Sequence, residues 1–507
     1  MLLVAAALRI HGLASLTNHL HYDEATSGLE ALSLLDNPRI TPFVASSGGR
    51  ESGWFYWIAP YMAALGASTF ALRLVPIFTG VLTTAACYTL GRELFGERGG
   101  LGAAAAFAVL YWPVHINHIA FRLNLFGLWG ALALAALWIA HRRNHRRAWL
   151  IAGLWLGLTA YTYFAARTWL LLGALQCLWW LWRGQRRALL TLIMMGLIGL
   201  PIIIFTLNNP MKAGGRIEHV AVNSFAEVLA NAHAWLGAWL YQGDMLITHN
   251  LPGRPVLDLP LAILTLLGLS TLFIKRRKTG LWILGLGFFS LIPTLFSQGA
   301  PQYLRGYGAT IALALVIGAG VVGLRHYGRK VQVAVIVLFF WAAVGTFIDY
   351  EQWLRIKRLE VAAEDEINAG LVHIADQYPR DGIVLVPGSN DLPVVDFRAR
   401  EYPQQAFGYF DSRLCTVLAD GGALYLHVIE LHPRFELTLR QWATVEVLER
   451  NTLGYNILRG KPMPVDWSNA LQFSDALLVK PLAITPEHPQ LGDTLNITLA
   501  IRPLQAL

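Results

Sequence analysis

Long apolar runs separated by short polar connections fill the first two thirds of the chain. A helix needs about 20 mainly apolar residues to cross the roughly 30 Å of hydrocarbon in a bilayer. A short apolar segment, Met1 to Leu8, opens the chain, and further runs lie at residues 69–91, 99–117, 123–140, 148–163, 168–182, 188–207, 257–274, 281–297, 309–324 and 331–348. The pattern predicts an α-helical polytopic membrane protein with about eleven transmembrane helices.

The opening segment is too short to cross a membrane by itself. Arg9 follows Leu8 and no small-residue cleavage site comes next, so we expect no cleavable signal peptide. We expect instead that the chain starts partway through its first transmembrane helix.

A polar and aromatic stretch, residues 15–68, separates the opening segment from the other runs. Apolar residues from Ala25 to Leu35 recur at helical spacing and predict a short amphipathic helix over 23–35. Residues 54–65 are rich in Trp and Tyr and too short to span easily, so we expect them to lie in the membrane interface.

The tail of the chain differs in composition from the rest. A charged stretch with helical character, Glu360 to Gln377, precedes runs of strand-forming residues. These runs begin at Ile383, Leu424, Val445 and Leu495. We therefore predict a transmembrane domain over residues 1–349, with a large first outer loop at 15–68, and a small α/β domain over residues 350–507.

Composition supports a membrane protein. Hydrophobic residues make up 55% of the 507 residues and charged residues only 14%, against about 25% in soluble proteins. The net charge of +8 is explained by basic loops and by contact with anionic membrane lipids, so no nucleic-acid partner is expected. The three cysteines are too scattered for a disulfide framework or a zinc site.

Basic clusters between alternate apolar runs predict the orientation. All of them fall on one side if the spans alternate, and the positive-inside rule makes that side cytoplasmic. The clusters are Arg92/Arg98, Arg142-Arg143 with Arg146-Arg147, Arg183/Arg186/Arg187, Lys275 to Lys278, and Arg325/Arg329/Lys330. This places the 15–68 loop and everything after residue 349 outside the plasma membrane of a bacterium or archaeon.

Two adjacent carboxylates, Asp23 and Glu24, stand at the start of the predicted amphipathic helix. One interpretation is that Asp23 caps this helix while Glu24 interacts with its dipole. The other is that a carboxylate here acts as a general base at the outer membrane face. By themselves the residues favour the cap.

Glu51 and several arginines also fall on the predicted outer side. Glu51 is either a loop charge paired with Arg50 or a second acid of the site that contains Asp23. In the second case it could also serve as a metal ligand. The arginines either extend to lipid headgroups or bind a phosphate through their guanidinium forks. They are Arg73, Arg122, Arg167, Arg216, Arg254 and Arg305, of which Arg122, Arg167 and Arg305 stand at tight span ends and are favoured.

Histidines on the outer side are expected to be packing or surface groups, since a metal site needs several to converge. They are His21, His115, His118, His219, His233 and His249. The sequence contains no HExxH, P-loop or Gly-rich dinucleotide motif.

Several short motifs, in this order, resemble the lipid-linked-sugar glycosyltransferases of the GT-C fold. The branch concerned holds the protein O-mannosyltransferases and the lipid A aminoarabinose transferase, that is, glycosyltransferase family 39 and its relatives. The resemblance covers roughly residues 9–310. It rests on His21-Tyr22-Asp23-Glu24-Ala25, Glu51 ahead of Trp54-Phe55-Tyr56-Trp57, Phe70 to Pro76, Leu90 to Gly96, and Gly157 to Tyr163.

The resemblance implies a site on the outer face that transfers a sugar from a polyprenyl-phosphate carrier to a hydroxyl of a lipid, glycan or protein acceptor. Asp23 would be the base, with Glu24 in support. Glu51 matches a position that binds metal in some members, which leaves a divalent metal open as a cofactor. The carrier phosphate would be bound by Arg73, Arg122, Arg167 and Arg305 together with Tyr163.

The chain departs from the family at one position. Related enzymes often carry Arg-Pro-Asp where this chain has Arg122-Leu123-Asn124, so Asn124 stands where an acid is expected. That change puts the metal and a mechanism with two acids in doubt.

Two other functions remain alternatives, a transporter or flippase of lipid-linked sugars and a non-catalytic scaffold. A transporter would tend to show charges near mid-span and paired, discontinuous helices. Here the charges cluster at span ends, which favours the enzyme.

Overall fold

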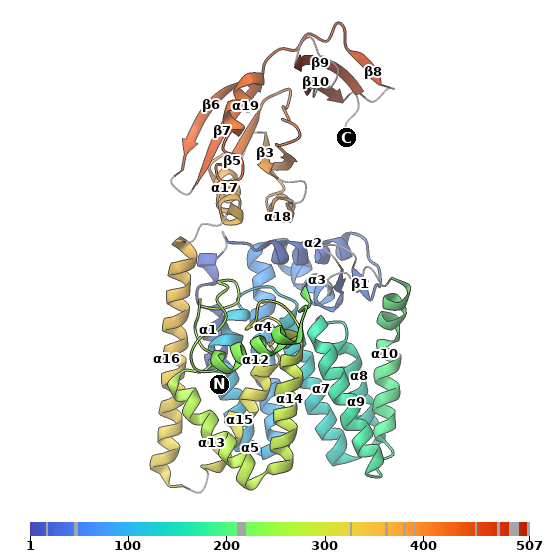
Figure 1. The fold of residues 1–507 in the computed structure, drawn as a ribbon, viewed down its shortest axis with the longest axis vertical. Helices are drawn as coiled ribbons and strands as arrows, with labels where there is room; N and C mark the ends of the chain where they lie inside the picture. The colour runs from blue at the N-terminus through green and yellow to red at the C-terminus, as the bar shows by residue number, and fades with distance from the viewer. Residues whose placement is uncertain are drawn as a thin grey trace.

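The computed structural model of the chain describes residues 1–16, 19–44, 49–209, 220–324, 327–359, 363–378, 382–388, 392–451, 454–473, 477–485 and 496–503. Figure 1 shows a bundle of long helices with an α/β part at one end and a small separate sheet beyond it.

The predicted apolar runs coincide with helices of the bundle. These are α1 (Leu2–Ile10), α4 (Thr69–Phe95), α5 (Glu97–Val109), α7 (Leu123–Arg143), α8 (Arg146–Thr159), α9 (Arg167–Trp182), α10 (Ala188–Asn208), α13 (Leu259–Lys275), α14 (Arg277–Leu295), α15 (Ala309–Gly323) and α16 (Arg329–Leu359). Within the described residues, six helices are long and apolar enough to cross a membrane, namely α4, α7, α9 with the turn before it, α10, α14 and α16. The prediction of a helical protein with several membrane spans is confirmed.

One predicted span is wrong as a single helix. The run at 99–117 divides into α5 and α6 (Tyr111–Ile116), with Leu110 extended between them. Pro113 lacks the N–H that would bond to the carbonyl of Val109 in a continuous helix. The Thr346 hydroxyl of α16 donates to that carbonyl instead, at 2.6 Å.

The 15–68 loop contains the two short helices that the sequence predicts. α2 (Tyr22–Asp36) and α3 (Gly53–Leu65) match the expected positions, and a short antiparallel pair of strands, β1 (Phe43–Val44) and β2 (Arg50–Glu51), lies between them. In Figure 1, α2 lies across the end of the bundle, directly below the α/β part.

The α/β part is built on a five-stranded mixed sheet. Its strand order is β4 (Ala406–Asp411), β3 (Ile383–Gly388), β5 (Ala423–Val428), β7 (Tyr455–Pro462) and β6 (Ala443–Arg450). β4 and β5 run parallel to β3, and β7 is antiparallel to both of its neighbours. The helices of this part are α17 (Ala363–Gln377), α18 (Pro393–Glu401) and α19 (Phe435–Trp442), and the separate sheet consists of β8 (Leu471–Phe473), β9 (Leu477–Thr485) and β10 (Asn496–Pro503).

The α/β part is joined to the bundle by a shared hydrophobic core. α17 and α18 stand at its base, next to the bundle in Figure 1. Phe397 of α18 and Val386 of β3 belong to the same buried cluster as Ala25 of α2, Trp54 of α3 and Leu72 of α4. The predicted division at residue 349 falls inside α16, and this domain boundary stays a prediction.

The opposite end of the bundle carries the basic connections. Arg142 in the last turn of α7 pairs with Glu93 of α4 at 2.7 Å, and Arg276 after α13 donates to the carbonyl of Leu94 at 3.2 Å. These contacts bring three of the basic connections together, as simple alternation of the spans requires. Arg325 lies outside the described residues.

Candidate active site

A cavity of about 480 Å³ lies among helix ends at the side of the bundle that faces the α/β part. Its walls come from the starts of α2, α7 and α9, from β2, from the end of α14 and from the loop after α14. Among the described residues, its charged lining consists of Asp23, Arg50, Glu51, Arg122, Arg167 and Arg305. Four guanidinium groups face two carboxylates, so the lining has an excess of two positive charges.

Most of the residues that the sequence singles out meet at this cavity. Asp23, Glu51, Arg122, Tyr163, Arg167 and Arg305 all line it. Glu24 and Arg73 do not. The sequence-based prediction that these residues act in catalysis remains a proposal, but their convergence gives it a geometry.

The start of α2 is held by residues other than Asp23. The helix begins at Tyr22, and the ring of His21 accepts a hydrogen bond from the backbone N–H of Asp23 at 3.1 Å. The Glu24 carboxylate accepts from the N–H of His21 at 3.1 Å, which completes a capping box. The interpretation of Asp23 as the cap is therefore wrong, because His21 and Glu24 do that work and leave the Asp23 side chain available for the cavity.

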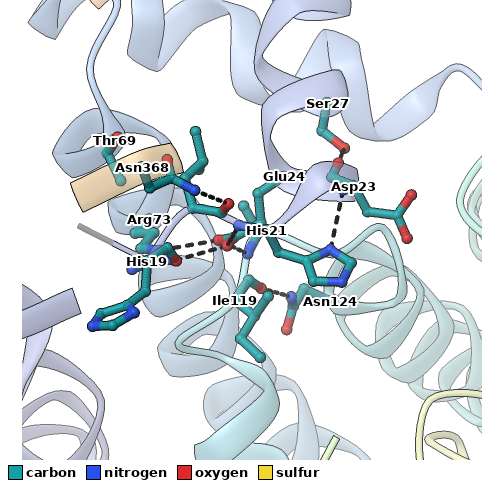
Figure 2. A network of polar contacts seen from close by, with 12 residues as sticks. His19, His21, Asp23, Glu24, Ser27, Thr69, Arg73, Ile119, Asn124 and Asn368 are labelled. Atoms are coloured by element: carbon teal, nitrogen blue, oxygen red, sulfur yellow. Dashed lines mark hydrogen bonds and ion pairs between the residues drawn. The ribbon is translucent and has the colours of Figure 1, made fainter. Parts of the chain in front are cut away.

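Glu24 forms a buried ion pair with Arg73 of α4. Its side chain is 1% exposed, and it accepts from Arg73 at 3.0 and 2.7 Å and from the N–H of Ala120 at 2.9 Å. Burial raises the pKa of this carboxyl, but the Arg73 charge and the hydrogen bonds lower it by more, so the pKa lies below its usual range. Figure 2 shows the Glu24–Arg73 pair turned away from the Asp23 carboxylate.

Asp23 faces the cavity and pairs with Arg50. One Asp23 carboxylate oxygen lies 2.5 Å from a guanidinium nitrogen of Arg50, whose side chain is 3% exposed, whereas that of Asp23 is 36% exposed. Sequence reasoning considered Arg50 only as a partner of Glu51. The signal that it missed is strand alternation, since neighbours on β2 point to opposite faces and cannot pair with each other.

Glu51 is bound by two arginines from different helices. Its carboxylate oxygens lie 2.9 Å from Arg122 and 3.4 Å from Arg167, and its side chain is 4% exposed. Each arginine also covers an aromatic ring, with Arg122 5.7 Å from the Tyr163 ring centroid and Arg167 4.3 Å from that of Phe164. Ion pairing and ring packing together fix both guanidinium groups at the cavity wall.

A glycine allows this approach. The N–H of Gly53 donates to the carbonyl of Tyr161 at 2.8 Å, and a Cβ at Gly53 would lie 2.6 Å from that oxygen. Only glycine lets the start of α3 pack so closely on the turn between α8 and α9. The contact brings Glu51, two residues earlier, next to Arg167.

The other arginines on this side differ in role. Arg305 lines the cavity and donates to the carbonyl of Gln298 at 3.2 Å. Arg254 is not in the lining. It pairs with Asp349 of α16 at 2.6 Å and stacks 4.3 Å from the ring centroid of Tyr111. Arg216 and His219 lie outside the described residues.

The described residues do not fit a metal site. No group of three or more His, Cys, Asp or Glu side chains among them converges on one point. A divalent cation needs carboxylate oxygens turned toward it, whereas both oxygens of Glu51 face guanidinium groups. His115 and His118 are buried, and each packs on an aromatic ring, Trp353 and Tyr350 respectively. No step proposed below passes through a metal.

Asn124, which replaces the acid expected from the family, has a structural task. Arg9 donates to the side-chain oxygen of Asn117 at 2.7 Å, so the Asn117 amide nitrogen must donate to the oxygen of Asn124, at 2.6 Å. The Asn124 nitrogen then donates to the carbonyls of Ile119 and Phe121, both at 2.9 Å. A carboxylate would place negative charge against these carbonyls, which explains why an amide suits this buried position.

Comparisons with known proteins agree with this architecture. Residues 53–209 match the family described as dolichyl-phosphate-mannose-protein mannosyltransferase. No curated protein matches the chain in sequence.

Solved structures match over most of the chain. The crystal structure of ArnT from Cupriavidus metallidurans bound to undecaprenyl phosphate has a TM-score of 0.55 at 14% identity and covers 90% of this chain and 97% of its own. The apo state of the same protein gives a TM-score of 0.53, also at 14% identity and with the same coverage of both chains. The oligosaccharyltransferase of Archaeoglobus fulgidus, in complex with Zn and sulfate, gives a TM-score of 0.43 at 15% identity and covers 80% of this chain and 62% of its own.

The two ArnT structures establish the fold, and the sequence match shows that residues 53–209 are similar to one glycosyltransferase family. The resemblance that the motifs predict is thereby confirmed. The chain is a membrane glycosyltransferase of the GT-C fold, and its residues 53–209 are similar to the dolichyl-phosphate-mannose-protein mannosyltransferase family.

Proposed function

We propose that the cavity transfers a sugar from a polyprenyl-phosphate carrier to an acceptor hydroxyl, with Asp23 as the base. The observation that carries this proposal is the cavity lining itself, where arginines in excess meet a partly exposed carboxylate. The arginines stabilise an anionic leaving group, and the carboxylate can take the proton of a hydroxyl nucleophile.

The arginines suit a phosphate. Arg122 and Arg167 are fixed by Glu51 and by aromatic rings, so they need little reordering when a phosphate binds. As the bond between the sugar and the phosphate breaks, negative charge grows on the phosphate oxygens. Guanidinium groups already held in place stabilise that charge in the transition state.

Asp23 suits the nucleophilic side. The acceptor oxygen forms a bond to the anomeric carbon, the bond from that carbon to the phosphate oxygen breaks, and polyprenyl phosphate leaves with the electron pair. The hydroxyl proton passes to the carboxylate of Asp23. The pair with Arg50 orients this carboxylate and leaves it 36% exposed toward the cavity.

A second hollow supports a lipid carrier. It has a volume of about 380 Å³, is almost wholly apolar, and is lined by α8, α9 and α10. Arg167 lines both this hollow and the charged cavity. Gly196 and Gly199 of α10 leave open space at its wall. A lipid phosphate bound by Arg167 therefore has an apolar path for its chain and a polar cavity for its sugar.

We place the cavity and the α/β part on the outer side of the membrane, because the basic connections lie at the other end. The cysteines allow a direct test, since Cys415 is exposed in the α/β part while Cys87 and Cys177 are buried. A membrane-impermeant maleimide should label intact cells that make the protein, and Cys415→Ser should abolish the signal. Labelling that appears only after lysis would reverse the orientation.

The catalytic proposal is tested by the release of polyprenyl phosphate from lipid-linked sugars supplied to the purified protein. Asp23→Asn should reduce turnover about 10²–10⁴-fold, the usual contribution of a general base, and should lower the melting temperature less than Glu24→Gln does, because Asp23 is 36% exposed and Glu24 only 1%. Glu30→Gln, also on α2 but absent from the cavity lining, is the control and should retain activity.

Other results would support the alternatives. Full turnover by Asp23→Asn would remove Asp23 as the base. A wild-type protein that moves lipid-linked sugar across vesicles without releasing polyprenyl phosphate would be a transporter. A protein that does neither would be a scaffold.

A further inference from the structure

The base of the α/β part contains a buried arginine that reaches into the bundle. Arg398 of α18 is 1% exposed. Its guanidinium donates to the side-chain oxygen of Asn368 at 3.3 and 3.2 Å and to the hydroxyl of Thr69 at 3.0 Å, and it pairs with Glu401. We call these four residues the Arg398 network.

The network holds the start of α4. Glu401 accepts from the backbone N–H of Thr69 at 2.8 Å and from its hydroxyl at 3.1 Å. Thr69 is the first residue of α4, and its N–H has no partner within the helix. The α/β part therefore supplies the groups that satisfy this helix end.

The same surface packs on α2. The ring of Phe397 lies against Gly28, where an added Cβ would be 2.3 Å from a ring carbon. Asn368 donates to the carbonyl of Leu20, just before α2, at 2.9 Å. The path of α2 is thus constrained from the side opposite the bundle.

A continuous set of contacts connects the network to the candidate base. Thr69 and Arg73 are four residues apart on α4, which places them on the same helix face. Arg73 pairs with Glu24, and Glu24 closes the capping box that sets the start of α2 next to Asp23. Figure 2 shows Thr69, Asn368, Arg73 and Glu24 side by side, with Asp23 on the far side of the helix start.

We propose that Arg398 is a positioning residue, and that the α/β part serves to hold α2 and the start of α4 so that Asp23 faces the cavity. This inference rests on the proposed function of Asp23. A buried polar network adds little net stability compared with apolar packing, but it favours one docked arrangement over slightly shifted ones. That property is what a site needs when a displacement of about 1 Å can cost a hundredfold in rate.

Arg398→Ala in the full chain tests the inference. We expect the amide hydrogens of α2 to exchange about tenfold faster, while those of α15, in the middle of the bundle, stay unchanged. Turnover should fall between about tenfold and a hundredfold, with the KM for the lipid-linked sugar within about threefold of the wild type. Arg440→Ala is the control, because Arg440 is exposed on α19 and pairs with Glu436 of its own helix.

If Arg398→Ala does not fold, the same measurements can be made on Thr69→Val. This variant loses the Thr69 hydroxyl at nearly constant side-chain volume. Faster exchange in α2 without any fall in turnover would overturn the positioning role, and unchanged exchange in α2 would overturn the docking role. A wild-type protein with no turnover would refute the proposed function alone, because the exchange measurement does not depend on activity.

Discussion

Asp23 and Glu24 are neighbours in sequence, yet they belong to different regions of the molecule. The Asp23 side chain is 36% exposed, lines the cavity and pairs with Arg50. The Glu24 side chain is 1% exposed and is bound by Arg73 and by two backbone N–H groups. The comparison teaches that two adjacent carboxylates at one helix start can lie in different environments, with Glu24 buried in an ion pair and Asp23 partly exposed to the cavity.

The same division applies to the arginines. Arg73 and Arg398 are buried among partners that satisfy the ends of helices. Arg122 and Arg167 are also paired, but their pairs lie in a cavity wall where four guanidinium groups face two carboxylates. The arginines at this end of the bundle thus divide by position, because Arg122 and Arg167 line the cavity whereas Arg73 and Arg398 do not.

The largest effect on stability should come from a substitution of Glu24, the buried carboxylate. Glu24→Gln removes the carboxylate charge that faces the buried guanidinium of Arg73, and breaking a buried ion pair typically costs about 3–5 kcal/mol in the free energy of unfolding. We expect a strongly lowered melting temperature in detergent, together with loss of activity through loss of fold. A variant as stable as the wild type would show that the two carboxylates do not differ as the structure indicates.

This ion pair should also make stability depend on pH. Because the pKa of Glu24 is lowered in the folded protein, its contribution is present above the unfolded value of about 4.3 and is lost as the pH falls through the folded value. When the pH is lowered from 7 to below the folded pKa of Glu24, the melting temperature of the wild type should therefore fall more than the melting temperature of Glu24→Gln. Equal slopes in both proteins would contradict the prediction.

A smaller effect is expected on the cavity side. Arg122→Lys keeps the charge but loses the planar fork, so we expect the KM for the lipid-linked sugar to rise about tenfold with the melting temperature nearly unchanged. Arg142→Lys is the matched control, since Arg142 is 57% exposed and pairs with Glu93 at the other end of the bundle. A change in stability without a change in KM would assign Arg122 to the structural group.

Much of the fold could be predicted because it depends on local patterns. The helices α2 and α3 and the bundle helices follow from apolar spacing, and, within the described residues, each strand-like run of the tail overlaps a strand of the structure. Strands β4 and β7 and helices α18 and α19 were not predicted, and the two helices are only nine and eight residues long. The break before α6 depends on a contact between Thr346 and Val109, which are far apart in the sequence.

By itself, the sequence determined the membrane class, the resemblance to a glycosyltransferase family, and most of the charged residues that line the cavity, although not Arg50. It did so because hydrophobic periodicity and charge at span ends are local properties of the chain. Only the tertiary structure decided which member of each pair faces the cavity. Asp23 was separated from Glu24 and Arg122 from Arg73, and Asn124 was placed in a buried hydrogen-bond network, because burial and hydrogen-bond partners come from segments far apart in the sequence.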